Sequence, residues 1–296
     1  MTSEPIWSGL SPDEHEFHYN PQRAFPNFKD YQALRAPANA RVRETLRCER
    51  DIPYGDHPLR RLDVYPAEGA SGPAPVHVFI HGGYWRAQDK ENFGFIAELF
   101  VKRGVTAVIV NYELAPASTL DAIADSAIAC MAWTLHEIGR FGGDPRRVSL
   151  SGHSAGAHLG AEILAENWAT RSLDPAAITG AVLISGIFDP APTMLTSVNA
   201  ETRLTAEIAA RRNVEARPPI MRCPTAVTVG GLEPWHWIDQ SFRYSHHLRR
   251  HGLDPEVHVL PGWNHFDILG QYLDPESAIF RMCLAAAARP AAEQDK

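Results

Sequence analysis

Cysteine is scarce in this sequence, and no two cysteines stand close enough along the chain to form a metal-binding or redox pair. The four that are present lie far apart: Cys48, Cys130, Cys223 and Cys283. Of these, Cys48, Cys130 and Cys283 fall within stretches that have strand-like or helix-like patterns. This distribution favours buried, reduced thiols over a disulfide framework.

Positive charge is not in excess either. Lys and Arg number 28 against 35 Asp and Glu, which gives a formal net charge of −7 with histidine neutral, and no basic stripe or tail occurs. This balance argues against a nucleic acid or an anionic membrane as partner. The hydrophobic content of 45% and the charged content of 21% are ordinary for a globular protein.

Long apolar runs are absent as well. No stretch approaches the length of about 18 apolar residues that spans a bilayer, and the segment Met1 to Pro5 lacks the basic and apolar regions of a secretory signal. We therefore expect a cytoplasmic protein without membrane segments, either a monomer or a small homo-oligomer. His247 and His251 are spaced for one face of a helix but have no third ligand, so we expect neither a metal nor a cofactor.

From residue 75 onward, short β-branched runs alternate with helical patterns. This alternation predicts an α/β fold, with a mostly parallel central sheet and helices on both faces. The expected strands are residues 76–80, 105–110, 148–150, 180–185, 225–229 and 256–260. The expected helices are residues 91–102, 121–140, 155–168, 239–251 and 276–288.

The first part of the chain lies outside this alternation. Residues 1–40 are polar and aromatic, and their prolines are expected to interrupt any long helix. Short helical pieces, such as residues 28–34, are expected to wrap over a larger body. Residues 42–51 and 60–66 are typical of two early antiparallel strands that precede the parallel sheet.

One long gap separates two predicted strands between Asp189 and Pro224. Prolines bound this gap, and its middle, residues 198–215, has a helical pattern. We expect a small cap at about residues 190–224 that lies over the carboxyl edge of the sheet. The chain is then a single domain, residues 1–296, with a cap insertion and an N-terminal wrap.

The chain is organised around a Gly-x-Ser-x-Gly motif, Gly152 to Gly156, which follows the apolar run of residues 147–150 and precedes an Ala-rich helical pattern. A strand that turns sharply into a helix strains its central residue and brings the flanking positions too close to neighbouring backbone for a Cβ. This is the spacing of a nucleophile elbow, so Ser154 is the predicted nucleophile. A coincidental match would leave Ser154 without partners elsewhere in the chain.

Two glycines directly after the strand of residues 76–80 are candidate oxyanion donors. Consecutive glycines let backbone N–H groups approach a substrate oxygen, and the N–H of Ala155 can join those of Gly82 and Gly83. The alternative is a glycine turn that only reverses the chain. The position of the loop directly after a core strand favours the oxyanion hole.

The other catalytic groups are expected at strand ends, because ligands bind at the carboxyl edge of a parallel sheet. His265 lies in the loop after the last predicted strand and is the candidate base. Glu233 follows the strand of residues 225–229 and is the candidate acid, with Asp189, one strand earlier, as the alternative. The order serine, acid, histidine resembles that of the α/β hydrolases.

Aromatic residues gather in the same loops. Four tryptophans follow predicted strands: Trp85, Trp235, Trp237 and Trp263. Together with Tyr84 they predict a flat aromatic pocket. His153, beside the elbow, is expected to line this pocket or to hydrogen-bond locally. The expected partner is therefore a small-molecule substrate with an aromatic group.

These motifs resemble the α/β-hydrolase-type arylformamidases, which are kynurenine formamidases, and their esterase relatives. The resemblance rests on residues 81–85 (His-Gly-Gly-Tyr-Trp), 152–156, 264–266 (Asn-His-Phe) and Glu233. Residues 19–23 are similar to the Tyr-Asn-Pro-Arg run of that group, with one glutamine inserted. Aspartate is usual in the family at the position of Glu233.

The resemblance implies a metal-independent serine hydrolase that cleaves a small aryl formamide, such as N-formylkynurenine, or an aryl ester through an acyl-enzyme. It assigns Ser154 as nucleophile, His265 as base, and the glycine loop with Ala155 as oxyanion donors. A general carboxylesterase for short-chain esters is the alternative within the same chemistry. An inactive scaffold that serves as a receptor or binding module is the alternative of another class, and the intact motifs favour the enzyme.

Overall fold

A computed structural model describes residues 5–171 and 173–290 of the chain. Its centre is an eight-stranded sheet in the order β1-β2-β4-β3-β5-β6-β7-β8. The pairs β1–β2 and β2–β4 are antiparallel, and the remaining pairs are parallel. The strands are β1 (Glu49–Pro53), β2 (Arg61–Tyr65), β3 (Ala74–Ile80), β4 (Thr106–Val110), β5 (Gly143–His153), β6 (Ile178–Ile184), β7 (Thr225–Gly230) and β8 (Glu256–Leu260). This mostly parallel sheet confirms the predicted fold class.

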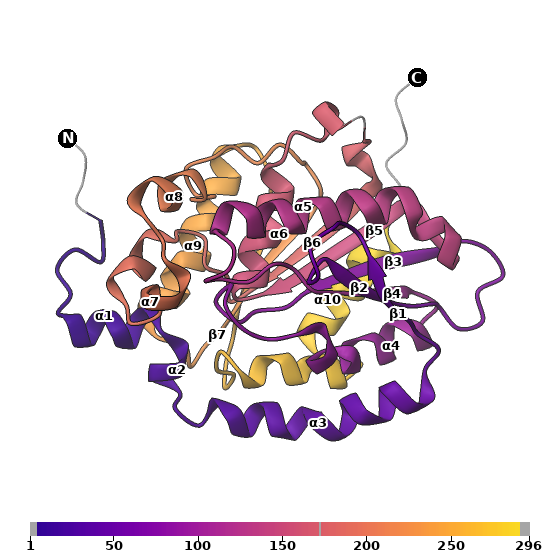
Figure 1. The fold of residues 1–296 in the computed structure, drawn as a ribbon, viewed down its shortest axis with the longest axis horizontal. Helices are drawn as coiled ribbons and strands as arrows, with labels where there is room; N and C mark the ends of the chain where they lie inside the picture. The colour runs from indigo at the N-terminus through magenta and orange to yellow at the C-terminus, as the bar shows by residue number, and fades with distance from the viewer. Residues whose placement is uncertain (1–4, 172, 291–296) are drawn as a thin grey trace.

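Helices cover both faces of the sheet (Figure 1). Helices α5 and α6 lie on one face, and α4, α10 and the long α3 lie on the other. The helices are α1 (Pro12–Tyr19), α2 (Pro21–Ala24), α3 (Phe28–Thr45), α4 (Ala97–Lys102), α5 (Leu120–Glu137), α6 (Ala155–Ala165), α7 (Asn199–Thr202), α8 (Ala206–Arg211), α9 (Trp235–Arg250) and α10 (Ala278–Ala288). The α/β/α layering is therefore the one that the sequence predicts.

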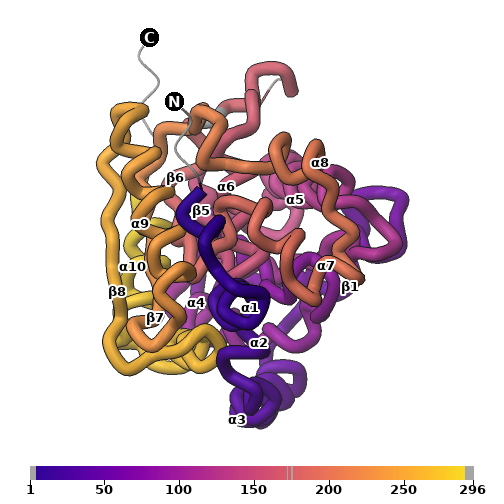
Figure 2. The backbone as a smooth tube through the Cα atoms, turned by 90° about the vertical axis from the view of Figure 1, so that its left-hand side faces the viewer, coloured from indigo at the N-terminus to yellow at the C-terminus, as the bar shows by residue number. Residues whose placement is uncertain are grey.

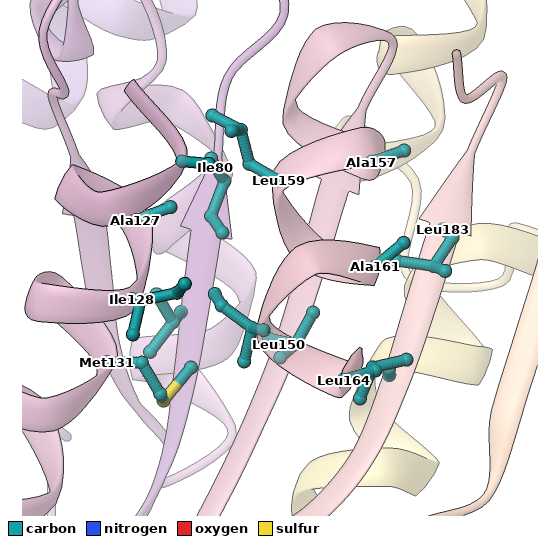
Figure 3. Packing of buried hydrophobic residues seen from close by; sticks show 14 of the residues in the cluster. Ile80, Ala127, Ile128, Met131, Leu150, Ala157, Leu159, Ala161, Leu164 and Leu183 are labelled. Carbon is teal, nitrogen blue, oxygen red and sulfur yellow. The ribbon is translucent and has the colours of Figure 1, made fainter. Parts of the chain in front are cut away.

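Alternate residues of the central strands supply the two halves of the hydrophobic core, because successive side chains of a strand point to opposite faces. In β3, Val78 and Ile80 belong to the cluster that includes α5 and α6, whereas Phe79 belongs to the cluster that includes α4 and α10. Figure 3 shows Ile80 and Leu150 of the sheet packed against the inner faces of α5 and α6. The two clusters fix both helical layers to the sheet.

The N-terminal segment contains one long helix where short pieces were expected. Helix α3 runs from Phe28 to Thr45 without a break at Pro37. An interior proline removes one hydrogen bond and crowds the preceding turn of a helix, yet the buried side chains of Ala38 and Val42 hold α3 against the body. The strand predicted from Val42 is therefore wrong at its start, and β1 begins at Glu49. Figure 2 shows α1 beside α9, with α2 leading down to α3.

Two other segments differ from the predicted helices. The helix expected from residue 91 begins only at Ala97, after two short 3-10 turns. Gly94, in the second of these turns, packs so closely on Tyr65 that a Cβ would lie 2.8 Å from the tyrosine hydroxyl. At the other end of the sheet, α9 begins at Trp235, ahead of the expected residue 239.

Residues 190–224 contain the short helices α7 and α8 where one helical middle was expected. This segment contacts the N-terminal one, since the His15 ring of α1 donates a hydrogen bond to the Pro192 carbonyl (2.9 Å). The division of one domain into a body, a cap and an N-terminal wrap stays a prediction. The four cysteines are free, and all but the half-buried Cys48 are buried.

A histidine is enclosed within the sheet at β3. His77 is 1% exposed, its two ring nitrogens lie 2.8 and 2.7 Å from the hydroxyls of Ser149 and Ser151, and its ring stacks on Phe100. Burial lowers the pKa of His77 from 6.5 to about 3. The folded protein therefore keeps this ring neutral over a pH range in which the unfolded chain protonates it.

The free energy of unfolding should decrease as the pH falls from about 6.5 toward 3, because only the unfolded chain then binds a proton at His77. The contribution of His77 is about 1.4 kcal/mol per pH unit. Urea unfolding between about pH 7 and pH 5 measures this slope. His77→Gln should flatten the slope, whereas the same change at the exposed His136 should not. Equal slopes for the two variants would contradict the prediction.

Candidate functional site

The candidate nucleophile lies on a sharp turn between β5 and α6. Ser154 has φ of 57° and ψ of −120°, and its backbone N–H donates to the Ile184 carbonyl (2.8 Å). A Cβ on Gly152 would lie 2.2 Å from the Gly156 carbonyl oxygen, and a Cβ on Gly156 would lie 2.0 Å from the Ile80 carbonyl oxygen. Both positions therefore require glycine, as the elbow motif predicts.

A continuous chain of hydrogen bonds joins the three side chains that the sequence singled out. The Ser154 hydroxyl donates to Nε2 of His265 (3.0 Å), and Nδ1–H of His265 donates to Oε2 of Glu233 (2.7 Å). All three residues are buried. A carboxylate can only accept a hydrogen bond, so Nδ1 of His265 must carry the ring proton. This tautomer leaves Nε2 free to accept the serine proton.

Further contacts hold the Glu233 carboxylate in place. Its Oε1 accepts hydrogen bonds from the Gly230 N–H (2.8 Å) and from the Ser185 hydroxyl. The indole N–H of Trp237 donates to the Ser185 carbonyl, and the Trp237 ring lies edge-on to His265 with centroids 4.8 Å apart. A carboxylate with these partners is oriented before any substrate arrives.

The alternative acid is engaged elsewhere. Oδ1 of Asp189 accepts hydrogen bonds from the Ala191 N–H (3.0 Å) and from the Asn213 amide (3.1 Å). Burial raises the pKa of Asp189 above its ordinary value. The structure thus joins Glu233, and not Asp189, to the histidine.

The glycine loop after β3 lies against the elbow. A Cβ on Gly82 would lie 2.9 Å from the His153 carbonyl oxygen and 3.0 Å from Cβ of Ser154. Gly83 has φ of 118°, and its carbonyl accepts hydrogen bonds from the N–H groups of Arg86 and Ala87. Both glycines line the cavity in front of Ser154, while Ala155 is fully buried at the first position of α6.

The cavity in front of Ser154 has a volume of about 60 Å³, which is small beside the 300–1,000 Å³ or so of typical ligand pockets. Of the predicted site residues, its walls contain Gly82, Gly83, Tyr84, His153, Ser154 and His265. The N-terminal segment supplies Pro21, Gln22, Gln32 and Arg35. A larger cavity of about 540 Å³ lies at the opposite edge of the sheet, and none of the predicted site residues line it.

Comparison with known proteins gives the family. The model of the α/β-hydrolase fold matches residues 77–268. The chain belongs to the α/β-hydrolase family. Kynurenine formamidase of Danio rerio is 30% identical to it over 289 residues, which cover 94% of this chain and 97% of that protein. This membership makes the chain a serine hydrolase of the α/β type, as predicted.

Solved structures agree with this assignment. A protein of Silicibacter sp. superposes on this α/β hydrolase with a TM-score of 0.80 at 25% identity, over 91% of this chain and 99% of that one. An esterase of Pyrobaculum calidifontis superposes with a TM-score of 0.72 at 19% identity, over 88% of this chain and 91% of that one. At that identity, the second likeness shows the shared fold alone.

The tryptophans of this hydrolase lie outside the cavity walls, in contrast to the predicted aromatic pocket. Trp85 and Trp237 are buried in the core behind the site, and Trp235 is 61% exposed on α9. Trp263 is half-buried and packs with the cluster around α10. The sequence shows that all four tryptophans follow strand ends. The direction of each side chain, which the sequence does not show, decides which of them reach the cavity. The aromatic rings in its walls belong to Tyr84, Phe93 and Phe266.

His153 does line the cavity, and its hydrogen bond is long-range, not local. Its Nε2–H donates to the His265 carbonyl (2.8 Å), 112 positions along the chain. Burial holds the pKa of His153 well below its ordinary value, so its ring is neutral. The ring therefore supports the loop that carries His265.

The N-terminal contribution to the cavity was not predicted. Gln32 and Arg35 stand one helical turn apart on α3, so they share a face of that helix. The similarity of residues 19–23 to a family motif was the one signal for this region, and it points to Pro21 and Gln22 in α2. Nothing in the pattern of α3 itself marks it as a wall of the site.

Metal-binding clusters and membrane-spanning helices are both lacking in the part of the chain that the structure describes. Across residues 5–171 and 173–290, no group of three or more His, Cys, Asp or Glu side chains is arranged to hold a metal ion. His247 is buried and its Nε2–H donates to the Arg217 carbonyl, whereas His251 is exposed. Within the same ranges, no helix has the length and apolar character needed to cross a membrane.

Proposed function

We propose that this α/β hydrolase cleaves a small aryl formamide, or an aryl ester, through an acyl-enzyme on Ser154. The observation that carries the proposal is the hydrogen-bonded chain from Ser154 through His265 to Glu233. In this proposal Ser154 is the nucleophile, His265 is the general base, and Glu233 stabilises the imidazolium that forms.

The steps follow from this geometry. Oγ of Ser154 attacks the substrate carbonyl carbon while its proton passes to Nε2 of His265. The N–H groups of Gly82, Gly83 and Ala155 are the proposed donors to the negative oxygen of the tetrahedral intermediate. When the intermediate collapses, the His265 proton goes to the departing nitrogen or oxygen. Water then attacks the acyl-enzyme with His265 again acting as base, which releases the acid and regenerates Ser154.

The size of the cavity favours a formyl group as the acyl part. A volume of about 60 Å³ accommodates the smallest acyl groups and leaves little room for a longer chain. The rings of Tyr84, Phe93 and Phe266 in the walls suit an aromatic leaving group. An arylamine leaves more readily than an alkylamine, because its nitrogen lone pair is delocalised into the ring. The kynurenine formamidase relative supports the same ranking.

A short-chain carboxylesterase is the second candidate. The structural likeness to an esterase concerns the fold, yet the proposed mechanism applies equally to an ester, since only the departing atom differs. A receptor without catalytic activity is the third, and the intact hydrogen-bonded chain argues against it.

Ser154→Ala should reduce turnover of both formanilide and phenyl formate by at least about 10³-fold, because the variant has no nucleophile. A fluorophosphonate probe should label wild-type Ser154 and fail to label the variant, which mass spectrometry can check. A wild-type protein that takes no label and turns over no substrate would support the receptor.

Activity should fall as the acyl group grows. Relative to a formyl donor, kcat/KM should drop at least about tenfold for butyryl and longer acyl groups on the same aryl leaving group, because overpacking a small cavity is costly. A series of N-acyl anilines and a matched series of p-nitrophenyl esters measures this. A many-fold preference for esters of butyrate over any formamide would favour the carboxylesterase.

Glu233→Gln should lower kcat by about 10²- to 10⁴-fold, since the amide cannot stabilise the imidazolium and can impose the wrong tautomer. The matched control is Asp189→Asn, which removes the other candidate carboxylate and should leave kcat nearly unchanged. The opposite ranking of the two variants would assign the acid to Asp189.

A further inference from the structure

A buried cation without a carboxylate partner lies in the wall of the active-site cavity. Arg35, on α3, is 8% exposed and lines the same cavity as Ser154 and His265. Within residues 5–171 and 173–290, no ion pair involves its guanidinium. Burying an unpaired charge is costly, so such a group in a cavity wall calls for an explanation.

The contacts of Arg35 occupy few of the hydrogen-bond donors of its guanidinium. One guanidinium N–H donates to the Phe266 carbonyl (2.8 Å), and Cζ lies 5.7 Å from the centre of the Phe95 ring. The carboxylate of Asp267 lies in the neighbourhood, but its oxygens accept hydrogen bonds from the backbone N–H and the side-chain amide of Asn264 (2.6 and 2.8 Å). Burial lowers the pKa of Arg35 to about 10, which leaves the group cationic at neutral pH.

Other shielded cations of this protein are paired, which sets Arg35 apart. Lys90, 3% exposed, lies 2.8 Å from carboxylates of both Asp51 and Asp63. Arg86, which lines the same cavity as Arg35, is paired with Glu201. These two cations are neutralised by carboxylates, whereas Arg35, on α3, has no carboxylate within ion-pair distance among the described residues.

Arg35 also lies where the cavity meets a second hollow. A groove of about 250 Å³ between α3 and the loop after β3 shares Gln32, Arg35, Gln88 and Phe93 with the walls of the cavity in front of Ser154. A substrate whose carbonyl is at Ser154 can thus extend past Arg35 into this groove. The combined space is large enough for an aryl group with a side chain, whereas the inner cavity alone is not.

We propose that Arg35 is the specificity residue of this site and that it binds a carboxylate carried by the substrate at some distance from the bond that is cleaved. The proposal rests on the proposed function, which it deepens by assigning the residue that selects a carboxylate-bearing substrate. A planar carboxylate matches the fork of the guanidinium. One negative charge balances the single unpaired positive charge, whereas a phosphate dianion would exceed it, since Arg43 in the same groove is already paired with Glu91.

A pair of substrates that differ only in charge tests this. One is 4-(2-formamidophenyl)butanoate, and the other is its carboxamide. The wild type should favour the acid by about 10- to 100-fold in kcat/KM, mainly through a lower KM. Arg35→Met should abolish that preference while it still cleaves the carboxamide, and Arg35→Lys should retain part of it.

The matched control is Arg86→Met, which removes a cation of the same cavity that Glu201 already neutralises. This variant should keep most of the preference for the acid. If Arg35→Met lowers kcat/KM for both substrates by the same factor, Arg35 acts only by positioning the His265 loop through the Phe266 carbonyl, and the proposal is overturned. A wild type that does not distinguish the two substrates overturns it as well.

A second measurement separates this proposal from the proposed function. The rate at which a fluorophosphonate labels Ser154 is followed in the presence of 4-phenylbutanoate or 4-phenylbutanamide, which needs no turnover. Preferential protection by the acid, lost in Arg35→Met, supports the carboxylate site even if no formamide is cleaved. Cleavage of formamides without preferential protection by the acid would retain the proposed function and reject the role of Arg35.

Discussion

The candidate active site depends on backbone packed against backbone around Ser154. Gly152 and Gly156 lie so close to neighbouring carbonyl groups that no side chain fits at either position, and Gly82 approaches the elbow almost as closely. Backbone contacts cannot yield by a change of rotamer, so the serine, the glycine loop and the start of α6 hold one another at fixed separations. That rigidity is what a pre-arranged hydrogen-bond chain requires.

A charged side chain that is buried in this site needs partners that offset the cost of removing it from water. Glu233 is buried, and His265, a backbone N–H and the Ser185 hydroxyl all donate to its carboxylate. Outside the cavity walls, burial raises the pKa of Glu215 to about 8 even though Arg243 lies beside it. Arg35 is the exception in the cavity wall, since it donates to a carbonyl and lies beside a ring but forms no ion pair with a carboxylate among the described residues. An enzyme site tolerates such a cost where the ligand supplies the missing group.

The sequence alone determined the sheet, the elbow and the candidates for the catalytic groups, because each rests on local rules. The β-branched runs fix the strands, the spacing of two glycines fixes the turn, and the ends of parallel strands meet at one edge. Local rules ranked Glu233 above Asp189 but did not decide between them. The choice depends on which carboxylate reaches Nδ1 of His265, and that distance exists only in the folded chain.

The tertiary structure alone decided the walls of the cavity. Trp235 and Trp237 are two positions apart at the start of α9, where a helix turns them to different sides, so one is exposed and the other is buried beside His265. Arg35 reaches the site because α3 continues through Pro37 and is held by contacts with distant parts of the chain. Long-range packing leaves no local pattern, so the sequence located the candidate reacting groups, and the fold selected the surfaces that surround them.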